Sequence, residues 1–325
     1  LANRGRSLVV AGLSQPVSVH ALVYFINKAL GNIGATLTLR PAPFLDSGFM
    51  RQSNASSIES LVAQMQEGRV ESLVILGGNP IFSAPADLNF GEKMKKVSSK
   101  IHLTLFENET SKECQWVVPL SHQLESWGDL RALNGTLSLV QPLIRPMYQS
   151  LSVLDFLLQL TGSSLSSFDF VKGNAVLTPA AWKKALNQGM ISGPTAGVTG
   201  GGGSVSAVFS MGEKSRQQKR AEKSGLEVTF SPDYNMWDGR FLNNGWLQEL
   251  PNPITKLTWD NAALVSAKTA KDLDVVTGDL IKISGGGRGV QSVVFVSPGQ
   301  ADGSIVLSIG YGRDVVGRVG EKTGF

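Results

Sequence analysis

Cysteine is nearly absent from this 325-residue chain, because Cys114 is the only one. One thiol excludes an internal disulfide framework. It also excludes an iron–sulfur cluster held by this chain alone, since such a cluster needs about four thiolates. Histidine is scarce as well: His20, His102 and His122 are too far apart in the sequence to form a zinc cage by themselves.

Long apolar runs and an excess of one charge are missing too. No apolar run approaches the roughly 20 residues of a membrane-spanning helix, so we expect no direct membrane span. The 30 basic and 26 acidic residues give a net charge of +4, too balanced for the clustered basic face that binds nucleic acid. The chain begins at Leu1 without a methionine or a signal-like segment, and we expect a fragment or a processed piece.

The composition that remains is that of an ordinary globular protein. Apolar residues make up 42% of the chain and charged residues 17%. At roughly 150 residues per domain, this length predicts about two domains.

Strand and helix patterns alternate over the first 162 residues. Short apolar runs predict strands at 7–11, 35–39, 72–76, 101–105 and 116–120. Helical repeats lie between Ser14 and Gly31, from a capping box at Ser56 and Glu59 to Gly68, from Phe90 to Val97, and from Val153 to Gly162. This alternation predicts a doubly wound parallel α/β sheet. In these patterns Asn27 falls on the polar face of its helix, and His102 alternates toward the surface of its strand.

The segment 163–224 reads as a connector. Thr178–Gly189 fits a short helix, and 193–204 contains six glycines in twelve residues, followed by a charged run. We predict that residues 191–224 are a mobile linker. A phosphate-cradling loop is the alternative, but no strand precedes the glycines and no Gly-Lys-Ser/Thr follows them.

From residue 226 onward the pattern is that of β-structure. Short strands are predicted at 226–230, 262–265, 280–283, 293–296 and 305–308, and one helical turn at 269–275. Short strands at this spacing, separated by Gly-Asp and Pro-Gly turns, indicate a closed barrel. The predicted domains are therefore 1–162, the connector 163–224 and 225–325.

Three sites could carry chemistry. The Gly12 turn, between a predicted strand and a helix that Ser14 can cap, could bind an anion or be only a tight turn. His122, with Glu125 and Asp129, could do acid–base work at a strand end or could brace the loop. Cys114 has no nearby basic side chain in the sequence, which favours a buried, inert thiol.

Several motifs resemble the molybdopterin oxidoreductase family. They are Leu76-Gly-Gly-Asn-Pro80, Glu109-Thr110, Val118-Pro-Leu120, Trp246-Leu-Gln-Glu-Leu-Pro251, Gly278-Asp279 and Gly310-Tyr-Gly-Arg313. The resemblance covers nearly the whole chain except 163–224. It implies a Rossmann-like α/β domain followed by that family's double-psi β-barrel.

One branch is more similar still. The stretches 122–129, 141–144, 238–240 and 243–246 resemble the large iron–sulfur subunit of bacterial alternative complex III, a quinol-oxidising respiratory complex. The resemblance implies a periplasmic location, peripheral to the inner membrane. The implied partners are the remainder of the polypeptide and other subunits of that complex.

The resemblance leaves two functions open. The chain is either a structural and assembly module without a cofactor of its own, not expected to be catalytic alone, or the cofactor-binding half of an active enzyme. In the second case the full-length protein would carry molybdopterin guanine dinucleotide. Its binding residues would be Gly12, Ser14, Gly78, Asn79, Glu109, Thr110, His122, Gly310 and Arg313.

Overall fold

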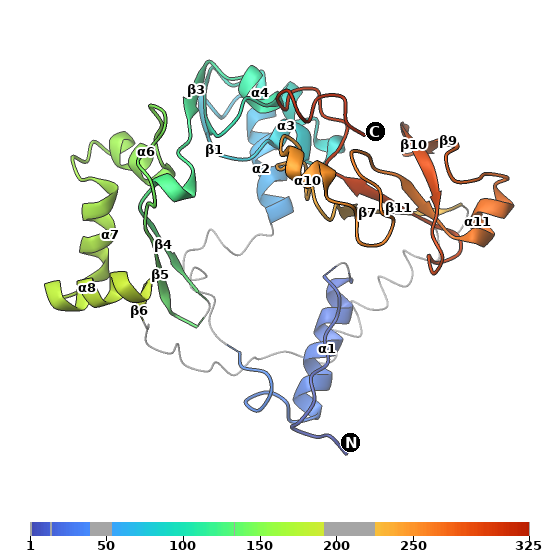
Figure 1. The fold of residues 1–325 in the computed structure, drawn as a ribbon, viewed down its shortest axis with the longest axis horizontal. Coiled ribbons are helices and arrows are strands. Elements are labelled where there is room, and N and C mark those ends of the chain that lie inside the picture. Colours follow the sequence, from blue (N-terminus) through green and yellow to red (C-terminus); the bar gives the residue numbers. More distant parts are fainter. Residues whose placement is uncertain (1, 14, 40–53, 133, 192–224, 325) are drawn as a thin grey trace. The chain divides into compact units, whose positions relative to one another are not determined.

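The structure, a computed structural model, describes residues 2–13, 15–39, 54–132, 134–191 and 225–324 (Figure 1). Contacts divide the chain into two compact units. Unit 1 comprises Leu1–Gln52, Trp127–Gln141 and Leu165–Ser224, and unit 2 comprises Ser53–Ser126, Pro142–Ser164 and Gly225–Phe325. The predicted domain limits stay a prediction, and the predicted mobile linker falls at 192–224, outside the described residues.

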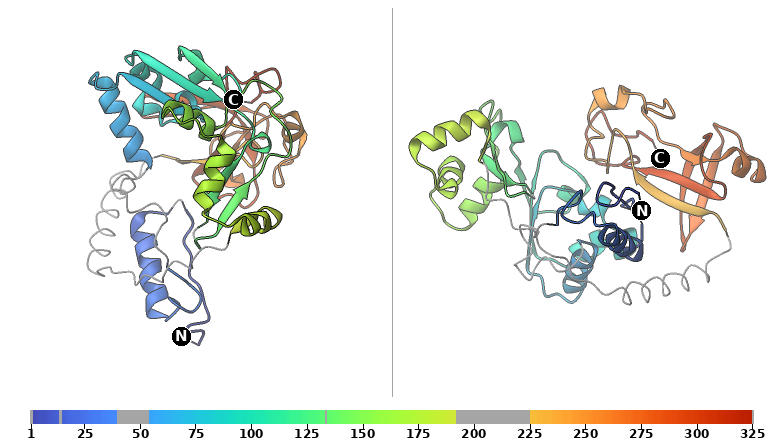
Figure 2. Two further views of the ribbon diagram at one scale, coloured as in Figure 1. Left: turned by 90° about the vertical axis from the view of Figure 1, so that its left-hand side faces the viewer. Right: turned by 90° about the horizontal axis from the view of Figure 1, so that it is seen from below.

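The first part of unit 2, which we name the parallel-sheet module (residues 53–126), contains three of the predicted strands. β1 (Ser72–Leu76), β2 (Ser99–Thr104) and β3 (Trp116–Pro119) pair in parallel in that order, and Figure 2 shows them running side by side. The intervening elements are short: α3 (Pro80–Ser83), η2 (Ala86–Leu88) and α5 (Glu109–Lys112).

One face of this sheet carries the core. Helices α2 (Asn54–Gln66) and α4 (Phe90–Met94) bury Val62, Met65, Phe90 and Met94 against Leu73 of β1. α2 begins at Asn54, two residues before the capping position predicted at Ser56. On the opposite face Val74, Leu76 and Trp116 remain exposed, so helices on both faces are not seen among the described residues.

The second part of unit 2, the mixed-sheet module (residues 225–325), has five strands in the order β7-β11-β8-β10-β9. The strands are β7 (Glu227–Pro232), β8 (Ala263–Val265), β9 (Leu280–Gly285), β10 (Arg288–Val296) and β11 (Ser304–Ile309). β7 with β11 and β8 with β10 pair in parallel, and the other pairs are antiparallel. Within the described residues these pairs do not close a ring, so the closed barrel stays a prediction.

Three helices complete unit 2. α10 (Gly245–Glu249) lies in the long excursion between β7 and β8, and α11 (Ala267–Asp272) follows β8 as predicted, with Ser266 as its N-cap. α6 (Val153–Leu160) agrees with the predicted last helix of the α/β region. Its N-terminus is capped by a capping box between Ser152 and Asp155.

Unit 1 contains a hairpin that the sequence patterns did not indicate. β4 (Gly128–Arg131) and β5 (Leu137–Val140) are antiparallel, and β6 (Met190–Ile191) adds to β5. Helices α7 (Ser167–Ala175) and α8 (Pro179–Gln188) accompany it, the second beginning after Thr178 as predicted. Phe168 packs edge-on between Trp127 and Trp182.

The two N-terminal strands predicted at 7–11 and 35–39 do not form. Helix α1 (Val17–Ala29) is present, but its one fully buried residue is Asn27, on the face predicted to be polar. The Asn27 side-chain oxygen accepts a hydrogen bond from the Val9 N–H at 3.0 Å, and its amide nitrogen donates to the Val9 carbonyl at 2.8 Å. The side chain therefore makes the two backbone hydrogen bonds that a neighbouring strand would make. The N–H groups of residues 35, 36 and 37 all donate to the Asn32 carbonyl, which makes a tight turn instead of a ladder.

Among the described helices, none combines the length and the apolar character that crossing a membrane requires.

Candidate functional site

Three loops of the parallel-sheet module follow the carboxyl ends of its strands. Asn79 comes after β1, Glu109 after β2 and His122 after β3. Because the strands are parallel, their carboxyl ends meet at one edge of the sheet, where ligands bind in open α/β folds. Asn79, Glu109 and His122 therefore follow strands that end at one edge of the sheet in unit 2.

The Asn79 side chain joins the first two of these loops. Its amide nitrogen donates to the Glu109 carboxylate at 2.5 Å. Its carbonyl oxygen accepts from the N–H of Thr110 at 3.1 Å and from the Thr110 hydroxyl at 2.7 Å. The residues of two separate motifs, Gly-Asn-Pro and Glu-Thr, are thus bonded to each other.

Arg313 of the mixed-sheet module reaches the same carboxylate. Its Nη2 and Nε donate to Glu109 at 2.9 and 3.3 Å, and the Val315 N–H donates at 3.2 Å. Arg313 also donates to the Gly239 carbonyl at 2.8 Å, and its guanidinium lies 5.3 Å from the centre of the Phe82 ring. The ion-paired side chains are only 7% and 14% exposed. We name Asn79, Glu109 and Arg313 the interdomain tie, because they join the two modules of unit 2.

Close backbone packing supports the tie. Gly239 and Gly310 both have positive φ, +89° and +116°, and a Cβ on Gly310 would lie 2.8 Å from the Gly239 nitrogen. Only glycine allows two backbones to approach this closely. The Asp238-Gly-Arg240 and Gly310-Tyr-Gly-Arg313 motifs therefore contact each other here. They are far apart in the sequence, and the sequence patterns did not predict this contact.

The tie controls the ionisation of Glu109. Burial alone would raise the pKa of the Glu109 carboxyl, but hydrogen bonds from Arg313, Asn79 and Val315 outweigh burial, so its pKa lies below the ordinary value. Glu109 is consequently held as a carboxylate, with little tendency to take up a proton as a general base would.

His102 lies beneath this edge, fully buried, and the surface position predicted for it is wrong. Its Nε2 lies 3.1 Å from the Gly78 carbonyl, while its Nδ1 is buried without a hydrogen-bond partner. The middle strand of the sheet has neighbours on both sides, and the loops above cover its end. Burial lowers the pKa of His102, and the backbone carbonyls of Gly78 and Gly77 only partly oppose this effect.

We expect His102 to make the stability of the chain depend on pH. Because its folded-state pKa lies below the ordinary 6.5, the unfolded chain binds the proton first. The stabilisation is full above pH 6.5 and is lost as pH falls from there toward the folded-state pKa, at up to about 1.4 kcal/mol per pH unit. Urea unfolding between pH 7.5 and 5 measures the slope. His102→Gln should flatten it; an unchanged slope in that variant would contradict the assignment.

A cleft of about 800 Å³ opens beside the tie, within unit 2. Its wall includes Gly77, Gly78 and Asn79, and four aromatic side chains: Phe82, Phe106, Phe241 and Trp246. We name it the aromatic cleft. Phe106, Phe241 and Trp246 are 57%, 45% and 87% exposed, so they form its outer rim.

Most polar side chains that line the aromatic cleft are bonded within the chain. Arg240 forms a two-pronged pair with Asp238, at 2.9 and 2.7 Å. The carbonyl oxygens of Asn243 and Asn244 accept from the N–H groups of Val319 and Leu247. Arg240 and the two asparagine carbonyl oxygens are therefore already used within the chain, whereas Glu107 adds an unpaired carboxylate to the wall.

The comparisons with known proteins agree with these motifs. No protein-family model matches the chain. Over 177 residues the chain is 25% identical to the menaquinone reductase, molybdopterin-binding-like subunit of Nitratidesulfovibrio vulgaris. The aligned residues cover 49% of this chain and 26% of that subunit. Among solved structures, acetylene hydratase from Pelobacter acetylenicus is similar in fold, with a TM-score of 0.60 and 15% identity; the match covers 80% of this chain and 40% of that one. In sequence the chain is similar to that molybdopterin-binding-like subunit, and in fold it is similar to acetylene hydratase. It spans about a quarter of the curated relative and two fifths of the solved chain.

The other predicted binding residues lie in different places. Gly78 and His122 line the aromatic cleft with Asn79 and Arg313, Thr110 bonds to Asn79 of the tie, and Gly310 packs against Gly239. Gly12 belongs to unit 1, where no strand precedes it, and Ser14 lies outside the described residues.

The hydrogen bonds of His122 and its neighbours are those of loop bracing. His122 Nδ1 accepts the N–H of Leu124, and the His122 N–H donates to Glu125, a capping box for η3 (Gln123–Glu125). Glu125 also accepts the Met147 N–H at 3.1 Å. Asp129 belongs to unit 1 and accepts from Asn174 at 3.2 Å. No acid–base triad is assembled from these three residues.

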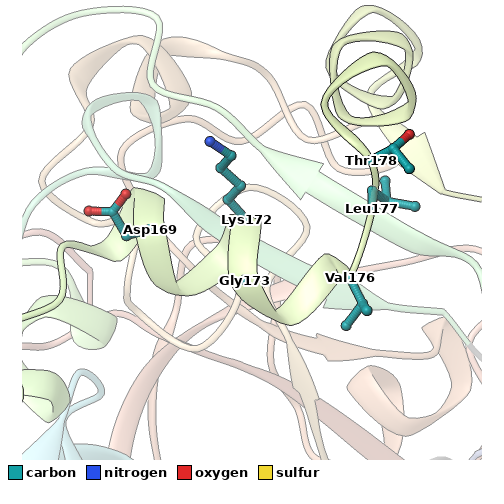
Figure 3. Close-up of a pocket in the computed structure, with 6 residues that line it drawn as sticks. All are labelled: Asp169, Lys172, Gly173, Val176, Leu177 and Thr178. Atoms are coloured by element: carbon teal, nitrogen blue, oxygen red, sulfur yellow. The ribbon is translucent and has the colours of Figure 1, made fainter.

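The remaining candidates carry little chemistry. Burial raises the pKa of the Cys114 thiol, whose Sγ lies 3.3 Å from the Thr110 carbonyl, in agreement with an inert thiol. A shallow depression along α7 in unit 1 is lined by Asp169, Lys172 and Val176, but these side chains point in different directions (Figure 3). The described residues contain no group of three or more potential metal ligands.

The cofactor that the resemblance implies contains a diphosphate, which needs unpaired cations or free N–H groups. In the aromatic cleft Arg240 is paired with Asp238 and Arg313 with Glu109, while Glu107 adds negative charge. The Gly77 N–H donates to the Leu103 carbonyl. Both arginines of the cleft are therefore already paired with carboxylates, and a diphosphate there would depend on the other donors of the wall, such as the Gly78 and Asn79 N–H groups.

Proposed function

We propose that this chain is a non-catalytic structural and assembly module of a molybdopterin oxidoreductase-like subunit in a quinol-oxidising respiratory complex. The interdomain tie carries the proposal. Asn79, Glu109 and Arg313, which the resemblance would assign to a cofactor, bond to one another and to the backbone. Groups that are satisfied in this way fix two modules together and leave little for a ligand.

The relatives support the setting. The curated relative is a subunit of a menaquinone reductase and is described as molybdopterin-binding-like. We propose that this chain likewise works with other subunits, on the periplasmic side and peripheral to the inner membrane, as in alternative complex III. We also propose that the mixed-sheet module is a double-psi-type barrel; its combination of parallel and antiparallel pairs supports this.

The second candidate is the cofactor-binding half of an active molybdopterin guanine dinucleotide enzyme. The observation in its favour is a roomy cleft at the carboxyl edge of a parallel sheet, with Gly77 and Gly78 in its wall. It is the weaker of the two, because both arginines of the cleft are already paired with carboxylates.

Metal and pterin analysis of the full-length protein, purified in its complex, tests the choice. The structural proposal predicts substoichiometric molybdenum and pterin. Asn79→Ala should weaken assembly, because it removes three hydrogen bonds of the tie, while quinol turnover per assembled complex stays unchanged. Stoichiometric molybdenum, or turnover that collapses in an intact Asn79→Ala complex, would favour the enzyme.

A further inference from the structure

We propose that the aromatic cleft is a binding site for an organic cation, an ammonium or guanidinium group that pairs with Glu107 and lies against the rings of the rim. The inference goes beyond the proposed function and does not depend on it, because it follows from the charge and the composition of the cleft wall. The two can fail separately: metal analysis tests the structural role, and ligand binding tests the cation site.

The unpaired charge of the wall is negative. Both arginines of the wall, Arg240 and Arg313, are neutralised by carboxylates. Glu107 lines the same cleft, and within the described part of the chain its carboxylate has neither a hydrogen bond nor an ion pair. An anion would meet this carboxylate with both arginines already engaged, whereas a cation would supply the partner that Glu107 lacks.

The rim offers aromatic surface to such a cation. Phe106, Phe241 and Trp246 line the cleft, and Phe106 directly precedes the unpaired carboxylate in the chain. A cation over an aromatic ring is attracted by the negative face of the ring, and tryptophan attracts it most strongly. The wall already contains one such contact, since the guanidinium of Arg313 lies 5.3 Å from the centre of the Phe82 ring. A free carboxylate beside several rings therefore favours an ammonium or guanidinium group.

Three further side chains of the wall offer donors. The side-chain oxygens of Asn243 and Asn244 accept backbone N–H groups, which leaves their amide nitrogens available. His122 accepts the Leu124 N–H at Nδ1, so its ring is uncharged and carries its proton on Nε2. Such donors bind a hydroxyl or carbonyl oxygen. The ligand is therefore a cation that also carries an oxygen, as a choline-like amino alcohol does, or a lysine or arginine elsewhere in the protein.

Choline and 3,3-dimethylbutan-1-ol, its uncharged analogue of the same shape, test the proposal in the full-length protein. If the cation is a free ligand, choline should bind about tenfold more tightly than the alcohol in an NMR titration. Glu107→Gln should remove this difference. Phe106→Leu should reduce it, because the variant keeps an apolar side chain but lacks the ring.

A second measurement covers a cation that the protein itself supplies. In that case choline should not bind the full-length protein, because the site is already filled. Glu107→Gln should then lower the thermal unfolding midpoint, because the enclosed cation loses its charged partner. Choline binding and the unfolding midpoint together therefore distinguish the two sources of the same chemical group.

Glu113→Gln is the matched control. Glu113 is exposed and does not line the cleft, so this variant makes the same change of charge outside the site. It should alter neither choline binding nor the unfolding midpoint. Equal effects of Glu107→Gln and Glu113→Gln would overturn the cation site. So would choline that binds no more tightly than the alcohol while Glu107→Gln leaves the midpoint unchanged, or inorganic pyrophosphate that binds more tightly than choline.

Discussion

Replacing Arg313 by alanine is expected to lower the free energy of unfolding by about 3–5 kcal/mol, the cost of breaking a buried ion pair by removing one partner. Glu109 would remain largely buried, with only Asn79 and the Val315 N–H as donors. The variant also loses the bond to the Gly239 carbonyl and the contact with Phe82. Urea unfolding of the whole chain measures the change.

Arg240→Ala is the matched control for this prediction. Arg240 also forms a two-pronged pair with an aspartate, but its side chain is 62% exposed. An exposed pair contributes about 0–1 kcal/mol, so this variant should unfold close to the parent protein. Similar losses of unfolding free energy in the two variants would mean that burial does not make the Glu109–Arg313 pair more stabilising than an exposed pair.

The same ion pair predicts an effect of acid. Because the folded-state pKa of Glu109 lies below its ordinary 4.5, the stabilisation is present above pH 4.5 and is lost as pH falls below it. This window lies below that of His102, which begins at 6.5. Arg313→Ala should therefore flatten the stability curve below pH 4.5 and leave the slope above pH 5 intact.

The sequence was sufficient for elements whose pattern and partners are local. The apolar runs at 72–76 and 116–120 became β1 and β3, and glycine or proline marked their ends. The loops after β1, β2 and β3 share an edge because parallel strands end on the same side, whereas the Gly12 turn, predicted to follow a strand, does not. Ser152 and Thr178 were followed by helices because a side-chain oxygen at the N-cap satisfies a free backbone N–H.

The sequence was insufficient where a residue far away in the chain determines the local structure or the burial of a side chain. The run at 7–11 has the pattern of a buried strand, yet the Asn27 side chain takes both backbone groups of Val9. His102 alternates as a surface residue would, but it occupies the middle strand under the Gly77–Gly78 turn. No spacing rule links Glu109 to Arg313, which are 204 residues apart, and Phe82 gives no signal at all before its ring is seen beneath a guanidinium.

Gly239→Ala is expected to be strongly destabilising. Its Cβ would lie 2.9 Å from the Gly310 carbonyl, 3.0 Å from the Phe82 ring and 3.1 Å from Arg313 Cδ. The Gly310 oxygen belongs to the backbone, and Arg313 is held by Glu109, so neither can move aside easily. The φ of +89° adds strain for any side chain.

Gly278→Ala separates these two effects. Gly278 has φ +101°, but nothing lies within 4 Å of a Cβ added at this position, so its alanine variant suffers backbone strain alone, about 1–3 kcal/mol. Gly239→Ala should exceed that loss by a further 1–3 kcal/mol, roughly the cost of overpacking. Combining Gly239→Ala with Arg313→Ala should give less than the sum of the single losses, because both act on one set of contacts. Full additivity in urea unfolding would mean that Gly239 and Arg313 do not support a common tie.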